Sequence, residues 1–267
     1  GTRDAPILLS RTPYNAEGAT SRNRSQKIEE ILPVMDAPFV NDGYIRVYQD
    51  VRGLHKSEGE YVMARPARGP LNKTKVDHAT DAFDTIDWLV KNVPETNGKV
   101  GIIGSSYLGF TTLMSLFDPH PALKAAVPQS PMVDGWMGDD WFHNGAFRTF
   151  GFDFALSQMV EKGGGSVPMG TGDEYDSYLQ AGSSAGYART WGLENLPVVR
   201  KMMEHPAYDS YWQEQAVDKL LARRKLTVPT LTMLGQWDQE DSYGAPHVYQ
   251  AVKAAQPDAP IMLGIGP

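Results

Sequence analysis

The sequence predicts an α/β fold in which helices cover both faces of a mostly parallel sheet, with a helical cap inserted into the chain. Short apolar runs alternate with amphipathic helical segments, one apolar run breaks into a helix at a serine, and one long segment interrupts the alternation. Alternation of strand and helix is typical of parallel sheets, because parallel strands need a crossover that is usually a helix. A chain of 267 residues is long enough to bury the core of such a domain.

The elements follow one another in a regular order. Apolar runs that fit buried strands lie at Ile7–Ser10, Tyr44–Asp50, Lys99–Gly104, Ala125–Pro128, Thr230–Leu234 and Ile261–Ile265. Spacing of apolar residues by three or four predicts helices at Ser25–Met35, Asp77–Val93, Leu108–Phe117 and Ala245–Ala255. The clearest is Asp77–Val93, where Ala82, Phe83, Ile86, Leu89 and Val90 form one apolar face.

The stretch from 135 to 226 departs from this order. It has no clear strand, but aromatic residues, helical segments around Leu156–Glu161, Pro197–Glu204 and Ser210–Arg223, and glycine clusters at 163–165 and 182–186 that predict mobile or disordered loops. An insertion of this length between two strands predicts a helical cap over the active-site edge of the sheet. The predicted division is 1–134 for the first part of the core, 135–226 for the cap and 227–267 for the second part of the core.

Composition excludes several classes of function. The net charge of −7 argues against nucleic-acid and anionic-membrane partners, and no apolar run approaches the roughly 18 residues of a membrane span. The absence of cysteine excludes disulfides and thiolate chemistry. The six histidines lack metal-ligand spacing, so we expect neither a metal site nor a cofactor.

The strand that breaks at a serine is the main functional signal. Gly104 permits a tight turn after the apolar run, and Ser106 would stand at its tip with helix following. This is the geometry of a hydrolase nucleophile, with the backbone amide of Tyr107 directed to where an oxyanion would form. The generic pattern has its second glycine two residues after the serine, whereas Gly109 comes three after it. The alternative is an ordinary strand–turn–helix junction with an idle serine.

The partners of such a serine follow in the order acid, then histidine. Asp238 follows the strand Thr230–Leu234 and stands where an orienting acid belongs; alternatively, it caps the next helix with its acidic neighbours. The only histidine after Asp238 is His247, which fits the surface of a helix better than the role of base. A second oxyanion donor could come from Tyr14 in the loop after the first strand, unless its ring only packs on the core.

These motifs together carry a family resemblance. Gly104-x-Ser106-Tyr107-x-Gly109, Arg11-Thr-Pro-Tyr14 and Gln49-Asp-Val-Arg-Gly53 with Ser57-Glu-Gly59 resemble the cocaine esterase and X-prolyl dipeptidyl peptidase class of serine hydrolases. The late glycine is that class's own pattern. Within the class, Asp139-Asp140-Trp141 and Trp237-Asp238-Gln239-Glu240-Asp241 are most similar to the α-amino acid ester hydrolases. The resemblance covers essentially the whole chain and implies the α/β-hydrolase fold.

The resemblance also implies roles for single residues. Ser106 would be the nucleophile, Asp238 the triad acid, and Tyr14 and Tyr107 the oxyanion donors. The carboxylates that would bind the α-ammonium group of a small-molecule substrate are Asp140, Glu240 and Asp241. Carboxylates that lie close together repel one another, and a cation among them relieves that repulsion. In the remaining motif, we expect Asp50 and Arg52 to form a structural ion pair.

The implied activity is hydrolysis or transfer of the acyl group of α-amino acid esters and amides through an acyl-enzyme, including β-lactam antibiotics with an α-amino side chain. The alternatives are a plain carboxylesterase, an X-prolyl dipeptidyl peptidase, and a non-catalytic binding protein on the same scaffold. Members of the class are often exported and tetrameric, which suggests a periplasmic or secreted location and a homo-oligomer. Neither the compartment nor the oligomeric state follows from these residues.

The resemblance further implies that the chain is a fragment. Members of the class have opening strands before this region. After it come a Trp-x-His segment with the catalytic base and a jelly-roll domain. We therefore expect the triad histidine beyond Pro267 and, for lack of it, an inactive fragment.

Overall fold

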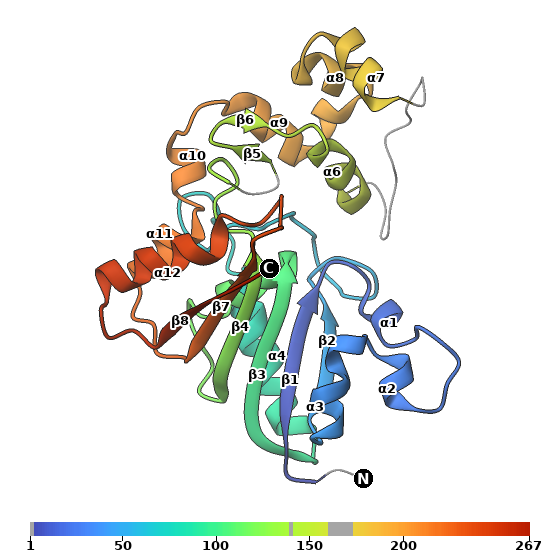
Figure 1. Ribbon diagram of the computed structural model, residues 1–267, viewed down its shortest axis with the longest axis vertical. Coiled ribbons are helices and arrows are strands. Elements are labelled where there is room, and N and C mark those ends of the chain that lie inside the picture. Colours follow the sequence, from blue (N-terminus) through green and yellow to red (C-terminus); the bar gives the residue numbers. More distant parts are fainter. Residues whose placement is uncertain (1–2, 139–140, 160–172) are drawn as a thin grey trace.

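The computed structural model describes residues 3–138, 141–159 and 173–267 (Figure 1). Asp140 and the glycine cluster at 163–165 lie outside these residues. No helix in the described residues is long and apolar enough to cross a membrane.

A six-stranded sheet forms the centre of the molecule, in the order β2-β1-β3-β4-β7-β8 (Figure 1). Its strands are β1 (Ala5–Thr12), β2 (Ile45–Asp50), β3 (Thr96–Ser106), β4 (Leu123–Pro131), β7 (Thr230–Gly235) and β8 (Ile261–Gly266). Every neighbouring pair is parallel, so all carboxyl ends lie at one edge. The predicted strands are all present, several of them longer than predicted.

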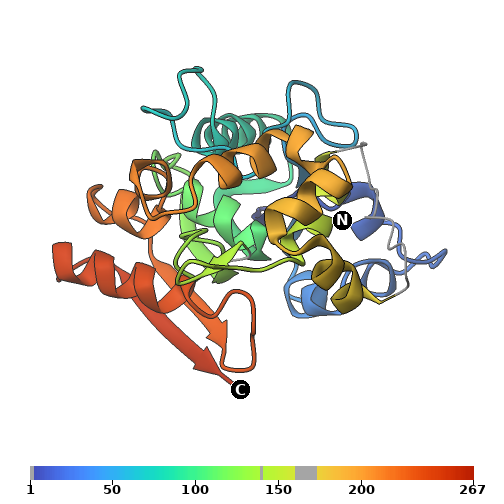
Figure 2. The same ribbon diagram turned by 90° about the horizontal axis from the view of Figure 1, so that it is seen from above.

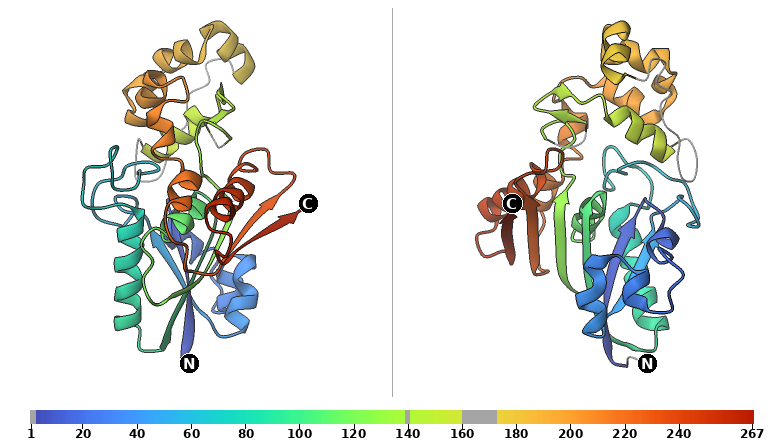
Figure 3. Two further views of the ribbon diagram at one scale, coloured as in Figure 1. Left: turned by 90° about the vertical axis from the view of Figure 1, so that its left-hand side faces the viewer. Right: turned by 45° about the vertical axis from the view of Figure 1, so that its right-hand side comes forward.

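Helices cover both faces of the sheet, as the α/β-hydrolase fold requires. Those of the core are α1 (Ala16–Ala19), α2 (Ile28–Ile31), α3 (Ala37–Asn41), α4 (His78–Asn92), α5 (Tyr107–Met114) and α12 (Gly244–Ala255). Figure 3 shows α3 and α4 on opposite faces. Asp77 forms a capping box with Thr80 at the start of α4. Ile86 and Leu89 of this helix share a buried cluster with Val100 and Ile102 of β3.

The helix predicted over Ser25–Met35 is wrong as a single element. The structure has α2, a 3-10 turn (Val34–Asp36) and then α3. Leu32, which precedes Pro33, has ψ of 161° and is extended. A proline disfavours helical backbone in the residue before it, so the helix ends there.

The predicted cap stands over the carboxyl edge of the sheet (Figures 1 and 2). Its elements are β5 (Phe142–His143), β6 (Ala146–Phe147), α6 (Gly151–Met159), α7 (Glu174–Ala181), α8 (Ser184–Thr190), a 3-10 turn (Leu193–Asn195), α9 (Pro197–Glu204), α10 (Ser210–Gln213) and α11 (Val217–Ala222). The boundaries at 135 and 226 stay a prediction.

Two features of this region differ from the sequence prediction. The short hairpin β5–β6 lies where no strand is predicted. The predicted loop at 182–186 instead begins α8, because the Ser183 side chain accepts a hydrogen bond from the Gly186 amide and caps the helix.

Candidate active site

Ser106 stands at the junction of β3 and α5 with a strained backbone. Its φ of 57° and ψ of −120° lie outside the regions that residues other than glycine ordinarily adopt. At Gly104, a Cβ atom would lie 2.6 Å from the carbonyl carbon of Leu108, so any side chain there would collide with α5. The predicted sharp strand-to-helix turn is therefore present, and a hydrolase nucleophile needs such a turn to expose its hydroxyl.

The late glycine has a packing reason. A Cβ atom on Gly109 would lie 2.7 Å from the carbonyl oxygen of Gln129 and 2.9 Å from Cα of Pro131. The helix α5 crosses the end of β4 at this residue, so only glycine allows the observed approach. Thr111 of the same helix donates a hydrogen bond of 2.9 Å to the carbonyl of Arg11 in β1. The helix is thus fixed to the strands on either side of β3.

Tyr107 contributes its backbone, not its side chain, to the exposed edge. It is the first residue of α5, and the N–H groups of a first helical turn have no partner inside the helix. Its side chain is fully buried, and the hydroxyl accepts a hydrogen bond of 2.9 Å from the Ala64 amide. Burial raises the pKa of this hydroxyl. The expected donor to an oxyanion is therefore the Tyr107 amide.

Tyr14 lies in the turn between β1 and α1. Its side chain is 46% exposed, in contrast to the buried Tyr107. The two rings meet edge to face at 6.4 Å, and the Tyr14 ring also lies 6.5 Å from that of Phe154 in the cap. The structure thus brings Tyr14 next to the residue that follows Ser106, and its role as second donor stays a prediction.

Asp238 lies in the loop between β7 and α12. Its Oδ1 accepts hydrogen bonds of 3.0 Å from the amides of Glu240 and Asp241, which closes a turn. The helix itself begins at Gly244, after an N-cap residue that makes no side-chain hydrogen bond. The alternative that Asp238 caps this helix is therefore wrong, because its carboxylate accepts hydrogen bonds within the loop and not from the first turn of the helix.

The surroundings of Asp238 favour its ionised form. Burial raises the pKa of this carboxyl, but other interactions outweigh burial and leave the pKa below its ordinary value. They are hydrogen bonds from the Asp241 amide, the Ser130 side chain and the Glu240 amide, together with the charge of Arg148. Ser130 has a positive φ of 35° at the end of β4. An orienting acid must stay charged, and Asp238 meets that requirement.

The predicted carboxylate cluster is described in part. Asp241 is buried and Glu240 is partly exposed, and both lie within three residues of Asp238 in the sequence. Asp140 lies outside the described residues. The described residues hold no group of three histidine, aspartate or glutamate side chains arranged for a metal ion.

Arg148, after the cap hairpin, is a residue that the sequence reasoning missed. Its Nη2 donates a hydrogen bond of 2.8 Å to Oε1 of Gln239 and lies 4.0 Å from Oε1 of Glu240. The guanidinium therefore links the cap to the loop of Asp238. Hydrophobic periodicity carries no signal for a contact between residues so far apart in sequence.

No histidine is joined to the candidate site. All six belong to the described chain, and none makes a hydrogen bond or ion pair with Ser106 or Asp238. The hydrogen bonds and ion pairs that their rings make are with Pro13, Asp87, Ala122, Asp209 and Tyr243. His247 stacks on Tyr243 and contacts its carbonyl at 2.7 Å through Nδ1, so it belongs to the structure of α12.

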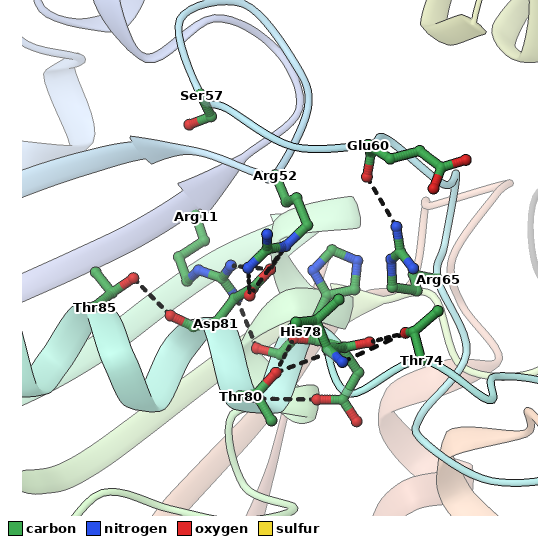
Figure 4. Close-up of polar contacts among 12 residues, drawn as sticks. Arg11, Arg52, Ser57, Glu60, Arg65, Thr74, His78, Thr80, Asp81 and Thr85 are labelled. Carbon is green, nitrogen blue, oxygen red and sulfur yellow. Dashed lines mark hydrogen bonds and ion pairs between the residues drawn. The ribbon is translucent and has the colours of Figure 1, made fainter.

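The predicted ion pair of Asp50 with Arg52 is wrong. Arg52 instead holds Asp81 of α4, with Nε 3.0 Å from Oδ2 and Nη2 2.5 Å from Oδ1 (Figure 4). Asp81 also lies 3.8 Å from the buried guanidinium of Arg11. The carboxylate of Asp50 accepts from a backbone amide, that of Ala16, at 2.7 Å. The strand β2 ends at Asp50, and Arg52 lies in the turn that follows, from which its guanidinium reaches α4.

Comparison with known proteins finds relatives of this chain. A solved α-amino acid ester hydrolase is 55% identical, with a TM-score of 0.97 over 100% of this chain and 44% of that one. A solved aminopeptidase from a marine sediment Thaumarchaeota archaeon is 49% identical, with a TM-score of 0.94 over 99% of this chain and 44% of that one. The cocaine esterase of Rhodococcus sp. (strain MB1 Bresler) is 28% identical over 248 residues, which are 87% of this chain and 39% of that protein.

The chain thus spans less than half the length of these relatives, which are esterases and peptidases. The family model for X-Pro dipeptidyl-peptidase (S15 family) matches residues 1–267. With its α/β-hydrolase fold, the chain belongs to the S15 family of hydrolases.

Proposed function

We propose that the protein containing this chain is a serine hydrolase that acts on esters and amides of α-amino acids through an acyl-enzyme. Ser106 would attack the substrate carbonyl, and the Tyr107 amide and the Tyr14 hydroxyl would stabilise the oxyanion. Asp238 would orient a histidine that takes the serine proton and returns it to the leaving group. We assign that base to a histidine outside these residues, beyond Pro267 in the full-length protein.

The observation that carries the proposal is the backbone of Ser106. Residues other than glycine keep such a conformation only where the surrounding structure enforces it, typically at functional sites. Here Gly104 and Gly109 are both required for the approach of α5 to the sheet. The idle-serine alternative offers no reason for this strain, whereas an exposed nucleophile does.

The acid loop supports a preference for substrates with an α-ammonium group. Glu240 and Asp241 stand next to each other in this loop, and we assign Asp140 to the same carboxylate cluster. A cation that enters such a group is held by charges that would otherwise repel one another. Acyl transfer to and from β-lactam antibiotics with an α-amino side chain belongs to the same proposal.

Covalent labelling tests the nucleophile. In the full-length protein, a fluorophosphonate probe should label Ser106, and Ser106→Ala should abolish both labelling and hydrolysis. The adjacent Ser105→Ala is the matched control, which should keep both. Absence of labelling in the wild type would favour a binding protein on a hydrolase scaffold.

Paired substrates test the ammonium preference. The methyl ester of an α-amino acid should exceed its des-amino analogue in kcat/KM by about 30-fold or more, which corresponds to the lower end of the 2–5 kcal/mol lost when a buried charge loses its partner. Asp140→Asn should erase most of this ratio. Equal values for the two esters in the wild type would instead indicate a plain carboxylesterase.

An aminopeptidase is a second candidate, favoured by the 49% identity to a solved aminopeptidase. It needs the same α-ammonium recognition but cleaves peptide bonds. Amino acid anilides, a Gly-Pro anilide and amino acid esters, compared by kcat/KM, distinguish aminopeptidase, X-prolyl dipeptidyl peptidase and ester hydrolase.

A further inference from the structure

The segment 49–59 carries a motif that the proposed function leaves without a role. It begins at the carboxyl end of β2 and continues through Ser57-Glu58-Gly59. In the parallel register, Thr12 of β1 pairs with Asp50 of β2. The motif therefore lies beside the turn that carries Tyr14, at the edge of the sheet where Ser106 stands.

Asp50 holds the backbone directly after Tyr14. Its Oδ1 accepts a buried hydrogen bond of 2.7 Å from the amide of Ala16, the first residue of α1. Hydrogen bonds to an ionised acceptor are roughly twice as strong as neutral ones. Asn15, between Tyr14 and Ala16, has a φ of 76°, so the chain turns sharply immediately after Tyr14. The carboxylate fixes the far end of that turn.

His55 holds the backbone directly before Tyr14. Its Nε2 lies 2.9 Å from the carbonyl oxygen of Pro13. A carbonyl oxygen only accepts hydrogen bonds, so Nε2 carries the proton in this contact. The φ of His55 is 47°, in the left-handed region that a residue other than glycine rarely occupies. Such strain persists where the surrounding structure enforces it, and here it accompanies the contact with Pro13.

Other motif residues fold the loop that carries His55. The hydroxyl of Ser57 donates a hydrogen bond of 2.6 Å to the carbonyl of Asp50. The amide of Gly53 donates one of 3.0 Å to the carbonyl of Glu58, and Gly53 has a φ of 80°. The loop therefore closes on itself and holds Asp50 and His55 in fixed positions relative to each other.

The direction of the Tyr14 phenol depends on this backbone. Its side chain is 46% exposed, and its ring meets that of Tyr107 edge to face and that of Phe154 at a tilted angle. A side chain that is nearly half exposed is restrained less by packing than one in a closely packed core. The backbone on either side of Tyr14 therefore contributes to where its hydroxyl lies.

We propose that Asp50 and His55 are positioning residues. Their hydrogen bonds fix the backbone on both sides of Tyr14 and so hold its hydroxyl where the oxyanion forms. This inference rests on the proposed function, because it takes Tyr14 as an oxyanion donor. Such a donor must lie about 2.7–3.1 Å from the oxyanion, so a small shift of the turn removes its effect. Neither Asp50 nor His55 needs to touch the substrate.

Matched variants separate positioning from mere stabilisation of the fold. His55→Phe keeps a ring but loses the donor, whereas His55→Gln restores an N–H group at a similar reach. Asp50→Ala removes the acceptor, whereas Asp50→Asn keeps an oxygen in the place of Oδ1. In the full-length protein, His55→Phe and Asp50→Ala should each lower kcat about 10- to 100-fold, which is no more than the loss of about 10²–10³ for a missing oxyanion donor. KM should change little, and the conservative variants should recover most of kcat.

A double-mutant cycle with Tyr14→Phe gives the decisive result. If His55 acts through Tyr14, adding His55→Phe to Tyr14→Phe should lower kcat no further, because the donor is already lost. Multiplicative losses would overturn the positioning role, as would a loss of kcat that follows only the unfolded fraction in thermal unfolding. Full kcat in Tyr14→Phe alone would instead contradict the proposed role of Tyr14, and this inference with it.

Discussion

At Ser106, the backbone is strained, and Gly104 and Gly109 allow the close approach of α5 that enforces this conformation. The positive φ of Ser106 would cost about 1–3 kcal/mol in an unsupported turn. Its neighbour Tyr107 fills the space below, with its ring fully buried and its hydroxyl bound to the Ala64 amide. This buried side chain anchors Tyr107 in the core and so keeps its backbone amide in place.

His78, the first residue of α4, packs against the buried ring of Tyr107. Its ring is buried between the edges of Tyr107 and Phe110, and neither ring nitrogen has a hydrogen-bond partner. Burial, followed by the charges of Arg11, Arg65 and Arg52, holds the pKa of His78 well below its ordinary range. The ring is therefore neutral in the folded protein at neutral pH.

The pH dependence of stability tests this state of His78. Below about pH 6.5, the His78 ring binds a proton in the unfolded chain but stays neutral in the folded chain. As the pH falls, the free energy of unfolding therefore decreases by up to about 1.4 kcal/mol per pH unit. Above that pH the effect vanishes. His78→Phe should remove this component from urea unfolding measured between pH 7.5 and 5.5. Phe110→Leu, a core change that keeps His78, should retain it, and equal slopes in His78→Phe and wild type would contradict the prediction.

At the scale of elements, α5 and α12 converge on the end of β4. Gly109 of α5 lies against Gln129 and Pro131 of this strand. At Gly244 of α12, a Cβ atom would collide with the carbonyl oxygen of Pro131 and lie 2.8 Å from Cγ2 of Val133. Two helices thus approach one strand through glycine contacts. Because one helix begins directly after Ser106 and the other follows the loop of Asp238, this packing holds the two residues in fixed positions relative to each other.

Alanine substitution at these glycines tests the convergence. Alanine gains about 1 kcal/mol over glycine in a helix, but a clash with backbone outweighs that gain. Gly109→Ala and Gly244→Ala should therefore each lose about 1–3 kcal/mol of unfolding free energy, measured by urea unfolding. Gly101→Ala in β3 is the control, because its Cβ atom would meet Leu8 at an ordinary 3.5 Å. A net gain of stability in the two helical variants would show that the helices do not need this approach.

Comparison of these elements with the sequence shows which parts of the fold and of the candidate site could be predicted. The parallel strands and α4 could be predicted because apolar periodicity is a local property of the chain. The roles of Asp50 and Arg52 could not, because Asp50 finds its partner at Ala16 and Arg52 finds its partner at Asp81, which only the folded chain brings near. Arg148 was missed for the same reason, since its contact with Gln239 joins cap and core. Residue type and spacing predicted Ser106 and Asp238 as candidates, whereas the contacts that support them depend on tertiary structure.

At the scale of the whole molecule, cap and core meet around the candidate site. Phe154 of α6 reaches the ring of Tyr14, and Arg148 reaches the loop of Asp238. The acids of that loop add to an overall charge of −7. Negative charge of this size attracts cations over distances longer than any single contact.

Ionic strength tests whether this charge assists the reaction. If α-ammonium substrates are guided to the acid loop, their kcat/KM should fall as salt rises, because the screening length shrinks from about 30 Å at 0.01 M to about 3 Å at 1 M. The des-amino ester, which carries no charge, should show no such fall and serves as the internal control. Raising the pH above about 8, where an α-amino group loses its proton, should bring the two esters closer together. Parallel salt profiles for both esters in the full-length protein would show that neither the net charge nor the acid loop guides the substrate, and that any preference arises only from contacts made after binding.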